Sequence, residues 1–395
     1  MSQIGRLLYV SGNYLDGSDG GVEHVWEIAD HLAHLGWGVT LIGLVRGESN
    51  ISDKQGNASE RLTVIPIQAR QRGGGLPAFS LWRAVARLTQ QYDFDLGYIR
   101  PARKTLFAAW RLYRIDVPYF VELNTNTRGE YRALGFNRLA VALADWMERR
   151  QFSHARGAFC VTRELGEYVR ERLPADAKVW ITGNGFRTEV TDLAVFDEGP
   201  RSALGISRDG TVITFLGSMQ PWHGVDLLMK ALACLPDTYL WVIGNGPERF
   251  CLEAMARSLD IENRVFWFGH RHGVELQALL NASDIGAGSL ALHRNGMYEA
   301  QPLKVRHFLG VGLPTIIGYK DTLLDLETPG VFYAHTPEEI AERIQEIQKR
   351  GNTRSVEYRQ QVREFALQHL SWGAIARSTS SILTDWLDST RQERR

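Results

Sequence analysis

The sequence of 395 residues lacks several features that would place it in other protein classes. It has only three cysteines, Cys160, Cys234 and Cys251, which are far apart and odd in number. This pattern argues against a disulfide framework and against a cysteine-based zinc site, and it indicates a reducing compartment. No run of 18 or more apolar residues occurs, and Arg6 interrupts the first apolar run. We therefore expect neither a membrane-spanning segment nor a signal peptide.

A net charge is also missing, because 45 basic residues balance 45 acidic ones. A local excess remains in residues 61–114, which carry ten basic side chains against only Asp93 and Asp95. These charges form either solvated helix faces or a surface for an anionic partner. One hypothesis is docking on anionic lipid headgroups. It draws on the aromatic residues interleaved with the charges, which are Trp82, Phe107, Trp110 and Tyr113.

Short apolar runs alternate with amphipathic helical stretches throughout the chain. One clear helical pattern is 22–35, where apolar residues recur at three- and four-residue spacing. This alternation predicts a parallel sheet covered by helices on both faces. The strands expected in the first half are 6–12, 38–44, 62–67, 96–99, 118–123, 157–161 and 178–181.

The same alternation restarts after residues 186–210, a polar and poorly periodic stretch that we interpret as a linker. Helices are expected from Gly224, from Glu248, near 274–280 and from Pro302. The sequence therefore predicts an α/β protein of two Rossmann-like domains, with ligands bound in a central cleft at the carboxyl ends of the strands. The strands expected in the second half are 212–216, 239–244, 264–269, 284–288 and 314–318.

Two glycine-containing loops each follow a first strand and lead into a helix. Gly20 and Gly21 in "GSDGGVEH" allow close approach of the backbone to a ligand, and the helix start supplies free N–H groups that favour phosphate. The alternative is a flexible strand-to-helix turn. In "FLGSMQPWHG", Gly217 ends a strand and His223 lies by the helix start, where it could donate to an anion or simply pack on the sheet. We interpret "GNGPE" at 244–248 as a structural turn.

Two further features concern titratable residues. His24, His31 and His34 lie on one predicted helix, but no carboxylate cluster completes a metal site, so we expect none. Glu299 directly precedes the helix that opens at Pro302. A carboxylate at that place stabilises the helix start, and it can also accept hydrogen bonds from sugar hydroxyls while the helix amides hold phosphates.

These motifs, taken in order, resemble the retaining GT-B glycosyltransferases of glycosyltransferase family four, also called group 1 glycosyltransferases. The resemblance covers most of the chain. It is carried by "GGVEH", "ITGNGF", "FLGSMQPWHGVDLL", "LWVIGNGPE", "RVFWFGH", "ASDIGAGS" and "YEAQPLKVRHFLGVGLPTIIGYKD". The family implies domains at 1–187 and 188–370, and a C-terminal helix within 371–395 that packs back on the first domain.

The resemblance also implies roles for particular residues. Glu299 would bind the hydroxyls of the donor hexose, and main chain around Gly269 and His270 would read the base. The other residues expected at the donor diphosphate are Gly20, Gly21, Gly217, Ser218, His223 and the amides of Leu303 and Lys304. Such enzymes need no metal, because these groups stabilise the leaving diphosphate in its place. Accordingly no Asp-x-Asp motif occurs in the segments expected at the cleft.

Four positions depart from the family pattern. Ser218 stands where a phosphate-binding arginine is usual, and His223 where a lysine is usual. Asn124 occupies the place of a histidine near the reacting carbon. His307 replaces the second glutamate of a paired-carboxylate motif, where the carboxylate faces the nucleotide ribose. His307 either holds one ribose hydroxyl or packs on its own helix beside Phe308.

The leading hypothesis is a metal-independent hexosyltransferase that uses a nucleoside-diphosphate sugar, with UDP-sugar favoured over GDP-sugar, and needs no cofactor. Its acceptor would be a glycan, glycolipid or small molecule, as in surface polysaccharide or glycoconjugate biosynthesis. The expected location is the cytoplasm or the inner face of the membrane, and no nucleic acid is expected as a partner. The alternatives are a degenerate GT-B protein that binds without turnover and a sugar-nucleotide epimerase on the same architecture.

Overall fold

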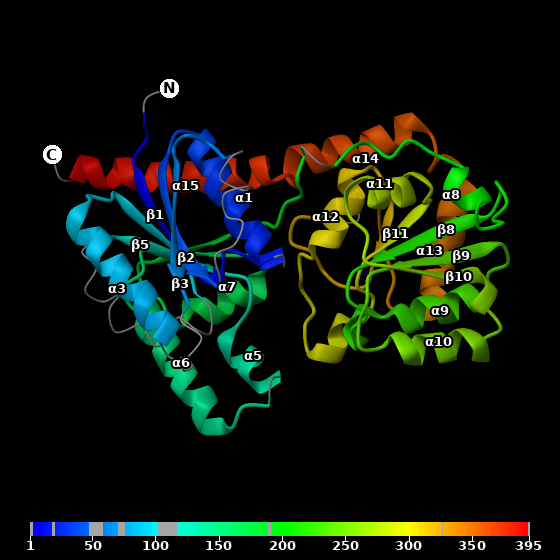
Figure 1. The fold of residues 1–395 in the computed structure, drawn as a ribbon, viewed down its shortest axis with the longest axis horizontal. Coiled ribbons are helices and arrows are strands. Elements are labelled where there is room, and N and C mark those ends of the chain that lie inside the picture. The colour runs from blue at the N-terminus through cyan, green and yellow to red at the C-terminus, as the bar shows by residue number, and fades with distance from the viewer. Residues whose placement is uncertain are drawn as a thin grey trace. The chain divides into compact units, whose positions relative to one another are not determined.

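The computed structural model describes residues 3–17, 20–46, 58–69, 76–101, 117–133, 135–188, 191–325 and 327–393. The chain divides into two compact units. Unit 1 comprises Met1–Gly183 together with Ile375–Arg395, and unit 2 comprises Asn184–Ala374. Figure 1 shows each unit as a sheet with helices packed around it.

Unit 1 is built on a parallel sheet with the strand order β3-β2-β1-β4-β5-β6-β7. Its central strands are apolar runs buried on both faces, as expected for strands between two helical layers. The elements of unit 1 are β1 (Arg6–Tyr14), α1 (Gly20–His34), β2 (Gly38–Val45), β3 (Leu62–Gln68), α3 (Leu76–Gln91), β4 (Leu96–Arg100), β5 (Tyr119–Leu123), α5 (Thr127–Ala133), α6 (Arg138–Phe152), β6 (Gly157–Cys160), α7 (Arg163–Arg170), β7 (Lys178–Ile181) and most of α15 (Trp372–Glu393).

The C-terminal helix α15 packs on unit 1, although its sequence follows unit 2. The indole Nε1 of Trp37 donates to Ser380 Oγ at 2.9 Å, and both side chains are buried. The ring of Trp386 lies edge-on to Phe120 of β5, with 5.5 Å between centroids. The predicted return of this helix to the first domain is therefore confirmed.

Unit 2 repeats the architecture with the strand order β10-β9-β8-β11-β12-β13, again parallel throughout. Its elements are α8 (Gly199–Ser202), β8 (Thr211–Leu216), the 3-10 turn η2 (Pro221–His223), α9 (Val225–Ala233), β9 (Thr238–Ile243), α10 (Arg249–Ser258), η3 (Glu262–Arg264), β10 (Val265–Gly269), α11 (Gly273–Asn281), β11 (Ile285–Ala287), η4 (Leu292–Asn295), α12 (Leu303–Gly310), β12 (Thr315–Ile317), β13 (Val331–Tyr333), α13 (Pro337–Arg350) and α14 (Val356–His369).

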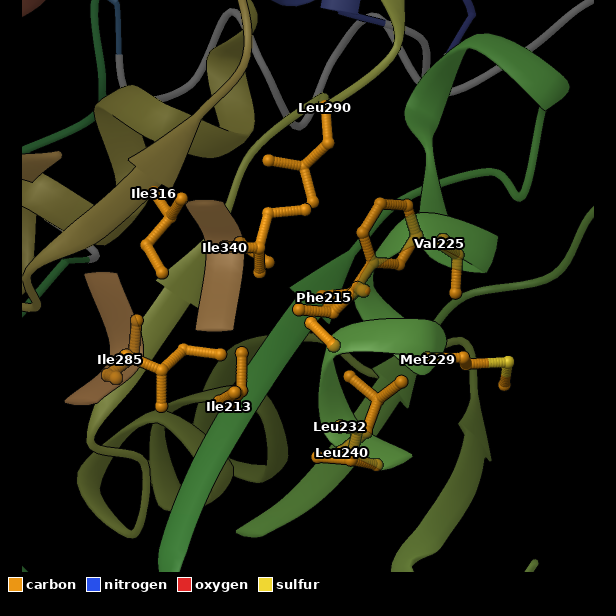
Figure 2. Packing of buried hydrophobic residues seen from close by; sticks show 14 of the residues in the cluster. Ile213, Phe215, Val225, Met229, Leu232, Leu240, Ile285, Leu290, Ile316 and Ile340 are labelled. Atoms are coloured by element: carbon orange, nitrogen blue, oxygen red, sulfur yellow. The ribbon is translucent and has the colours of Figure 1, made fainter. Parts of the chain in front are cut away.

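The core of unit 2 lies between its sheet and the helices that follow the strands (Figure 2). Side chains of β8, such as Ile213 and Phe215, pack there with Leu232 of α9 and Ile340 of α13. All four are buried, so the burial of apolar surface at about 25 cal/mol per Å² drives the folding of this unit. The core also fixes the carboxyl end of β8, from which the loop at Gly217 leaves the sheet.

All twelve expected strands form, and the two parallel sheets confirm the predicted fold class. The strand β13 was not predicted, because its three residues are too few to show a period. The interpretation of 186–210 as a linker is wrong. Arg201 within it is buried and donates to Ala282 O at 2.7 Å, and Ala194 N donates to Val311 O at 2.8 Å. Such buried polar contacts bind this stretch to unit 2.

The lipid-docking hypothesis loses one of its aromatic residues, because Trp82 is 1% exposed and belongs to the core of unit 1. Phe107, Trp110 and Tyr113 lie outside the described residues. Across the described ranges, no helix has the length and apolar character needed to cross a membrane.

Candidate functional site

The order of the strands in unit 2 reverses between β8 and β11. In open parallel sheets, ligands bind at such a point, outside the carboxyl ends of the strands. The predicted residues Gly217, Ser218 and His223 follow β8 directly, and Gly269 ends β10. The helix α12, with Leu303 and Lys304 in its first turn, follows β11 through a long connection. Most of the predicted donor residues therefore belong to one edge of this sheet.

The loop after β8 lies so close to the loop after β9 that glycine is needed at the contact. A Cβ on Gly244 would lie 2.2 Å from Gly217 O, and a Cβ on Gly246 would lie 2.2 Å from Met219 N. Gly217 and Gly244 also have φ values of +130° and +127°, which favour glycine. The Asn-Gly turn interpreted as structural thus positions the loop that carries Gly217 and Ser218.

The ring of His223 is already engaged with the main chain. Its Nδ1 hydrogen-bonds Ser218 O, and because a carbonyl only accepts, Nδ1 carries the proton of the neutral ring. Burial, together with the nearby charge of Lys304, lowers the pKa of His223 to about 4. The neutral ring therefore presents an acceptor at Nε2, and it can donate to an anion from that nitrogen only after it is protonated.

Lys304 places its ammonium group beside Gly217. Its Nζ lies 4.3 Å from the centroid of the Phe215 ring, and a Cβ on Gly217 would lie 3.1 Å from it. The residue as a whole is partly exposed, but Nζ itself is buried and has no hydrogen-bond partner among the described residues. Burial alone lowers the pKa of Lys304 to about 7. The sequence motif indicated a role for the amide of this residue but none for its side chain.

Glu299 is 6% exposed and lies just before α12. Its Oε1 is 3.6 Å from Nζ of Lys320, whose side chain is mostly exposed. The backbone holds the two residues together, because Ala300 N donates to Lys320 O at 3.1 Å and Lys320 N donates to Tyr298 O at 2.9 Å. A carboxylate held in this way can accept hydrogen bonds from hydroxyl groups in a fixed position.

A buried ion pair anchors the segment between Glu299 and α12. Arg306 and Asp321 are both 0% exposed at their side chains and form a bidentate pair, with Nη2 to Oδ1 at 2.9 Å. Gln301 Oε1 accepts from Asn184 N at 2.9 Å, and Asn184 Nδ2 donates to Gln301 O at 2.8 Å. These contacts could not be predicted from the sequence, because the partners are distant along the chain and no single motif pairs them.

The remaining donor residues of unit 2 are less enclosed. Gly269 has a φ of +67° with no atom within 4 Å of an added Cβ, and His270 beside it is exposed. His307 is partly exposed, and burial lowers its pKa to about 4. Its ring makes no hydrogen bond to any described residue, so both nitrogens are available to a ligand.

Unit 1 contains a buried cluster of charged side chains that none of the sequence motifs indicated. Nε2 of His24 contacts Glu122 Oε1, Arg100 Nη1 lies 3.4 Å from the same oxygen, and the Tyr9 hydroxyl donates to Oε2 at 3.0 Å. Burial alone would raise the pKa of Glu122, but His24 and Arg100 lower it to about 2. The signal for this cluster was a glutamate inside the apolar strand "PYFVEL", since a buried carboxylate needs partners.

Asn124 is attached to this cluster. With its amide oxygen turned toward Arg100, it accepts from Nη1 at 2.6 Å and its nitrogen donates to Leu123 O at 3.2 Å.

Gly20 and Gly21 lie in the first turn of α1 rather than in a loop. The rings of His31 and His34 bond the main-chain oxygens of the residues four positions earlier, at 2.9 and 3.0 Å.

Two cavities of about 870 Å³ each lie away from the predicted donor residues. One, in unit 1, lies against α15 and is lined by Trp180 and Trp386 among others. The other, in unit 2, is lined by Tyr298, Lys320 and Tyr333 among others. The second borders Glu299 through its sequence neighbour Tyr298, but Glu299 does not line it. Neither cavity therefore identifies the donor site.

Solved structures share the fold of nearly the whole chain. Sucrose-phosphate synthase from Thermosynechococcus elongatus has a TM-score of 0.73 at 15% identity, over 97% of this chain and 100% of that one. Anabaena HepE in complex with UDP and glucose has a TM-score of 0.68 at 16% identity, over 96% and 100%. At such low identities the likeness shows the fold alone, which is GT-B.

Two adjacent family models identify the family. The one described as "Glycosyl transferase 4-like domain" matches residues 19–185, and the one described as "Glycosyl transferases group 1" matches residues 198–368. The chain therefore belongs to the group 1 glycosyltransferases. The D-inositol 3-phosphate glycosyltransferase of Corynebacterium glutamicum is 28% identical over 228 residues, which are 53% of this chain and 50% of that protein. The chain thus matches about half the length of this curated relative.

Proposed function

We propose that this protein transfers a hexose from a nucleoside-diphosphate sugar to an acceptor, with retention of configuration and without a metal ion. The observation that carries the proposal is the grouping at one sheet edge of unit 2. There the buried carboxylate of Glu299 precedes α12, and the first turn of α12 brings Lys304 beside the Gly217 loop. A sugar nucleotide needs such a pairing, because its hydroxyls donate to a carboxylate while its phosphates seek positive charge.

In this proposal the groups have distinct tasks. Glu299 accepts from the hexose hydroxyls, and the amides of Leu303 and Lys304 at the start of α12 hold the diphosphate. Main chain at Gly269 and His270 reads the base, and His307 contacts the ribose. Positive charge near the leaving diphosphate stabilises the negative charge that develops as the bond to the sugar breaks. Gly20, Gly21 and Asn124 of unit 1 remain predicted contacts of the donor.

UDP is the favoured nucleotide, and HepE, which shares the fold, is described in complex with UDP and with UDP-glucose. The acceptor is proposed to be a glycan or glycolipid. Two relatives from Rhizobium meliloti carry names that refer to lipopolysaccharide core biosynthesis, and they match 18% and 30% of this chain. Free thiols at all three cysteines fit the proposed place of action, the cytoplasm or the inner face of the membrane.

One set of observations favours a second candidate, a GT-B protein that binds nucleotide without turnover. The neutral ring of His223 uses its only N–H to donate a hydrogen bond to Ser218 O. The amide oxygen of Asn124 accepts hydrogen bonds from Arg100. His223 therefore does not offer the cation of the lysine that is usual in the family at its position. Asn124 does not offer the imidazole of the histidine that is usual at its position. Glu299 argues against this candidate. A protein that only binds nucleotide does not need a buried carboxylate beside the start of a helix.

The test is incubation of the full chain with a panel of UDP- and GDP-sugars, with slow donor hydrolysis and nucleotide release as the readouts. Release of nucleotide and free sugar supports the transferase. Formation of a C2-epimer indicates an epimerase, and binding without chemistry indicates the degenerate protein. A thermal-shift screen run in parallel identifies the donor, because a ligand that binds the folded state raises its melting temperature.

A further inference from the structure

The loop after β8 in this chain lacks the cationic side chains that a diphosphate would meet there. Ser218 is neutral, and His223 is held neutral by burial and by the nearby charge of Lys304. A sugar nucleotide nevertheless brings two negative phosphates to this edge of the sheet. Some other group must balance that charge, because an uncompensated charge at a partly buried site is costly.

We propose that the side-chain ammonium of Lys304 is this group, and that it emerges beside Gly217 to bind the donor diphosphate. This inference rests on the function proposed above. It is carried by the position of Nζ, which is buried, without a hydrogen-bond partner among the described residues, and 4.3 Å from the ring centroid of Phe215. A buried ammonium that meets only an aromatic face is poorly compensated, since such a contact is weaker than a charge-assisted hydrogen bond.

The surroundings explain how the ammonium is kept available. Gly217 has no side chain, and a Cβ at that position would lie 3.1 Å from Nζ, so glycine leaves this space open. Phe215 is fixed by the core of unit 2 on β8 (Figure 2). The amides at the start of α12 lie on the same segment as Lys304, so the ammonium and the helix start can meet one anion together.

Binding should be accompanied by uptake of a proton. Burial lowers the pKa of Lys304 to about 7 in the free protein, and a bound diphosphate favours the charged form. His223, on the loop after β8, is close enough for the charge of Lys304 to lower its pKa, and His307 lies three residues along α12. Their pKa values are lowered to about 4, so both are neutral at pH 8. At pH 8 the ammonium of Lys304 is therefore the group expected to gain the proton.

Calorimetric titration with UDP and with uridine tests the proposal on the wild type, Lys304→Met and Lys230→Met. Lys230 is an exposed lysine of α9 and controls for general surface charge. We expect Lys304→Met to weaken UDP binding by about 10- to 100-fold and to leave uridine binding unchanged. Lys230→Met should leave both unchanged. In buffers of different ionisation enthalpy at pH 8, the wild type should take up close to one proton with UDP, and Lys304→Met none.

A purely structural lysine gives a different result. Loss of a structural contact would lower the melting temperature and weaken UDP and uridine alike, whereas removal of a buried amino group that has no hydrogen-bond partner among the described residues should leave the melting temperature equal or higher. Lys304→Gln provides a second variant if Lys304→Met does not fold. Equal weakening for both ligands, or unchanged UDP binding with proton uptake retained, overturns the inference while the transferase function stands. Absence of any nucleotide binding by the wild type overturns both.

Discussion

Arg306 of α12 and Asp321, which follows β12, form an ion pair from which solvent is excluded on both sides. Arg306 Nε also donates to Asn184 O at 3.2 Å. The pair therefore ties three separate segments of unit 2 together around the start of α12. Since Glu299 and Lys304 flank that start, the ion pair fixes the segment that carries both proposed donor-binding groups.

Asp321→Asn should destabilise unit 2 strongly, because it leaves the buried guanidinium of Arg306 uncompensated. Breaking such a pair costs about 3–5 kcal/mol. Urea denaturation of the full chain measures the effect, and Glu198→Gln is the control, since its pair with Arg208 is exposed and should cost under about 1 kcal/mol. A loss for Asp321→Asn as small as that of the control would show that the pair does not hold the segment.

Glu299→Gln should keep the fold but remove most sugar transfer. Each charge-assisted bond to a sugar hydroxyl contributes about 1.5–3 kcal/mol, and a neutral amide recovers only part of it. Donor hydrolysis should fall by at least about 10-fold at an unchanged melting temperature. Lys320→Met is the matched control, because it removes the exposed partner of Glu299 and should have a much smaller effect. Near-wild-type turnover by folded Glu299→Gln would refute the assignment.

Activity should not depend on a metal ion. The start of α12 and the ammonium of Lys304 already offer positive charge to a leaving diphosphate. We expect the rate of nucleotide release to be the same in EDTA as in Mg²⁺ or Mn²⁺. A large loss in EDTA that either ion restores would contradict the prediction and call for a metal bridge between the protein and the phosphates.

His307→Glu should tighten nucleotide binding by roughly 5- to 30-fold, and His307→Ala should loosen it modestly. The reason is that a neutral ring offers one acceptor, whereas a carboxylate accepts from both ribose hydroxyls through charged bonds. The effect should shrink for a 2′,3′-dideoxy nucleotide, which lacks these hydroxyls. Calorimetric titration compares the three proteins. Differences that persist with the dideoxy ligand would place His307 away from the ribose.

The lowered pKa of His307 should also make the unfolding free energy depend on pH. Burial lowers the pKa of His307 to about 4, whereas in the unfolded chain it is about 6.5. As pH falls between these values the unfolded state binds the proton first, so the contribution of this group to the unfolding free energy is complete above about pH 6.5 and is lost toward pH 4. His307→Gln should lose less stability than the wild type over that range. Parallel curves for the two proteins would argue against the shift.

Much of this protein could be predicted from the sequence, because the deciding forces were local or periodic. The apolar runs of the strands, the 3.6-residue repeat of α1 and the glycines at the turns act within a few residues. The order of the motifs from "GGVEH" to "LKVRH" indicated the family. Glu299, Gly217 and His307 were named as candidate donor residues in the same way, because each occupies a definite place in a motif.

Tertiary structure alone decided what the charges do. The pairing of Arg306 with Asp321 depends on side chains that are 15 residues apart and meet only when α12 packs beside the loop after β12. Residues 186–210, which were predicted to be a linker, belong to unit 2 because Arg201 forms an ion pair with Asp284, 83 residues away. Whether Lys304 carries a solvated or a buried ammonium depends on Phe215 and Gly217. Burial and electrostatic partners arise from the packing of distant segments, and no local pattern in the sequence encodes that packing.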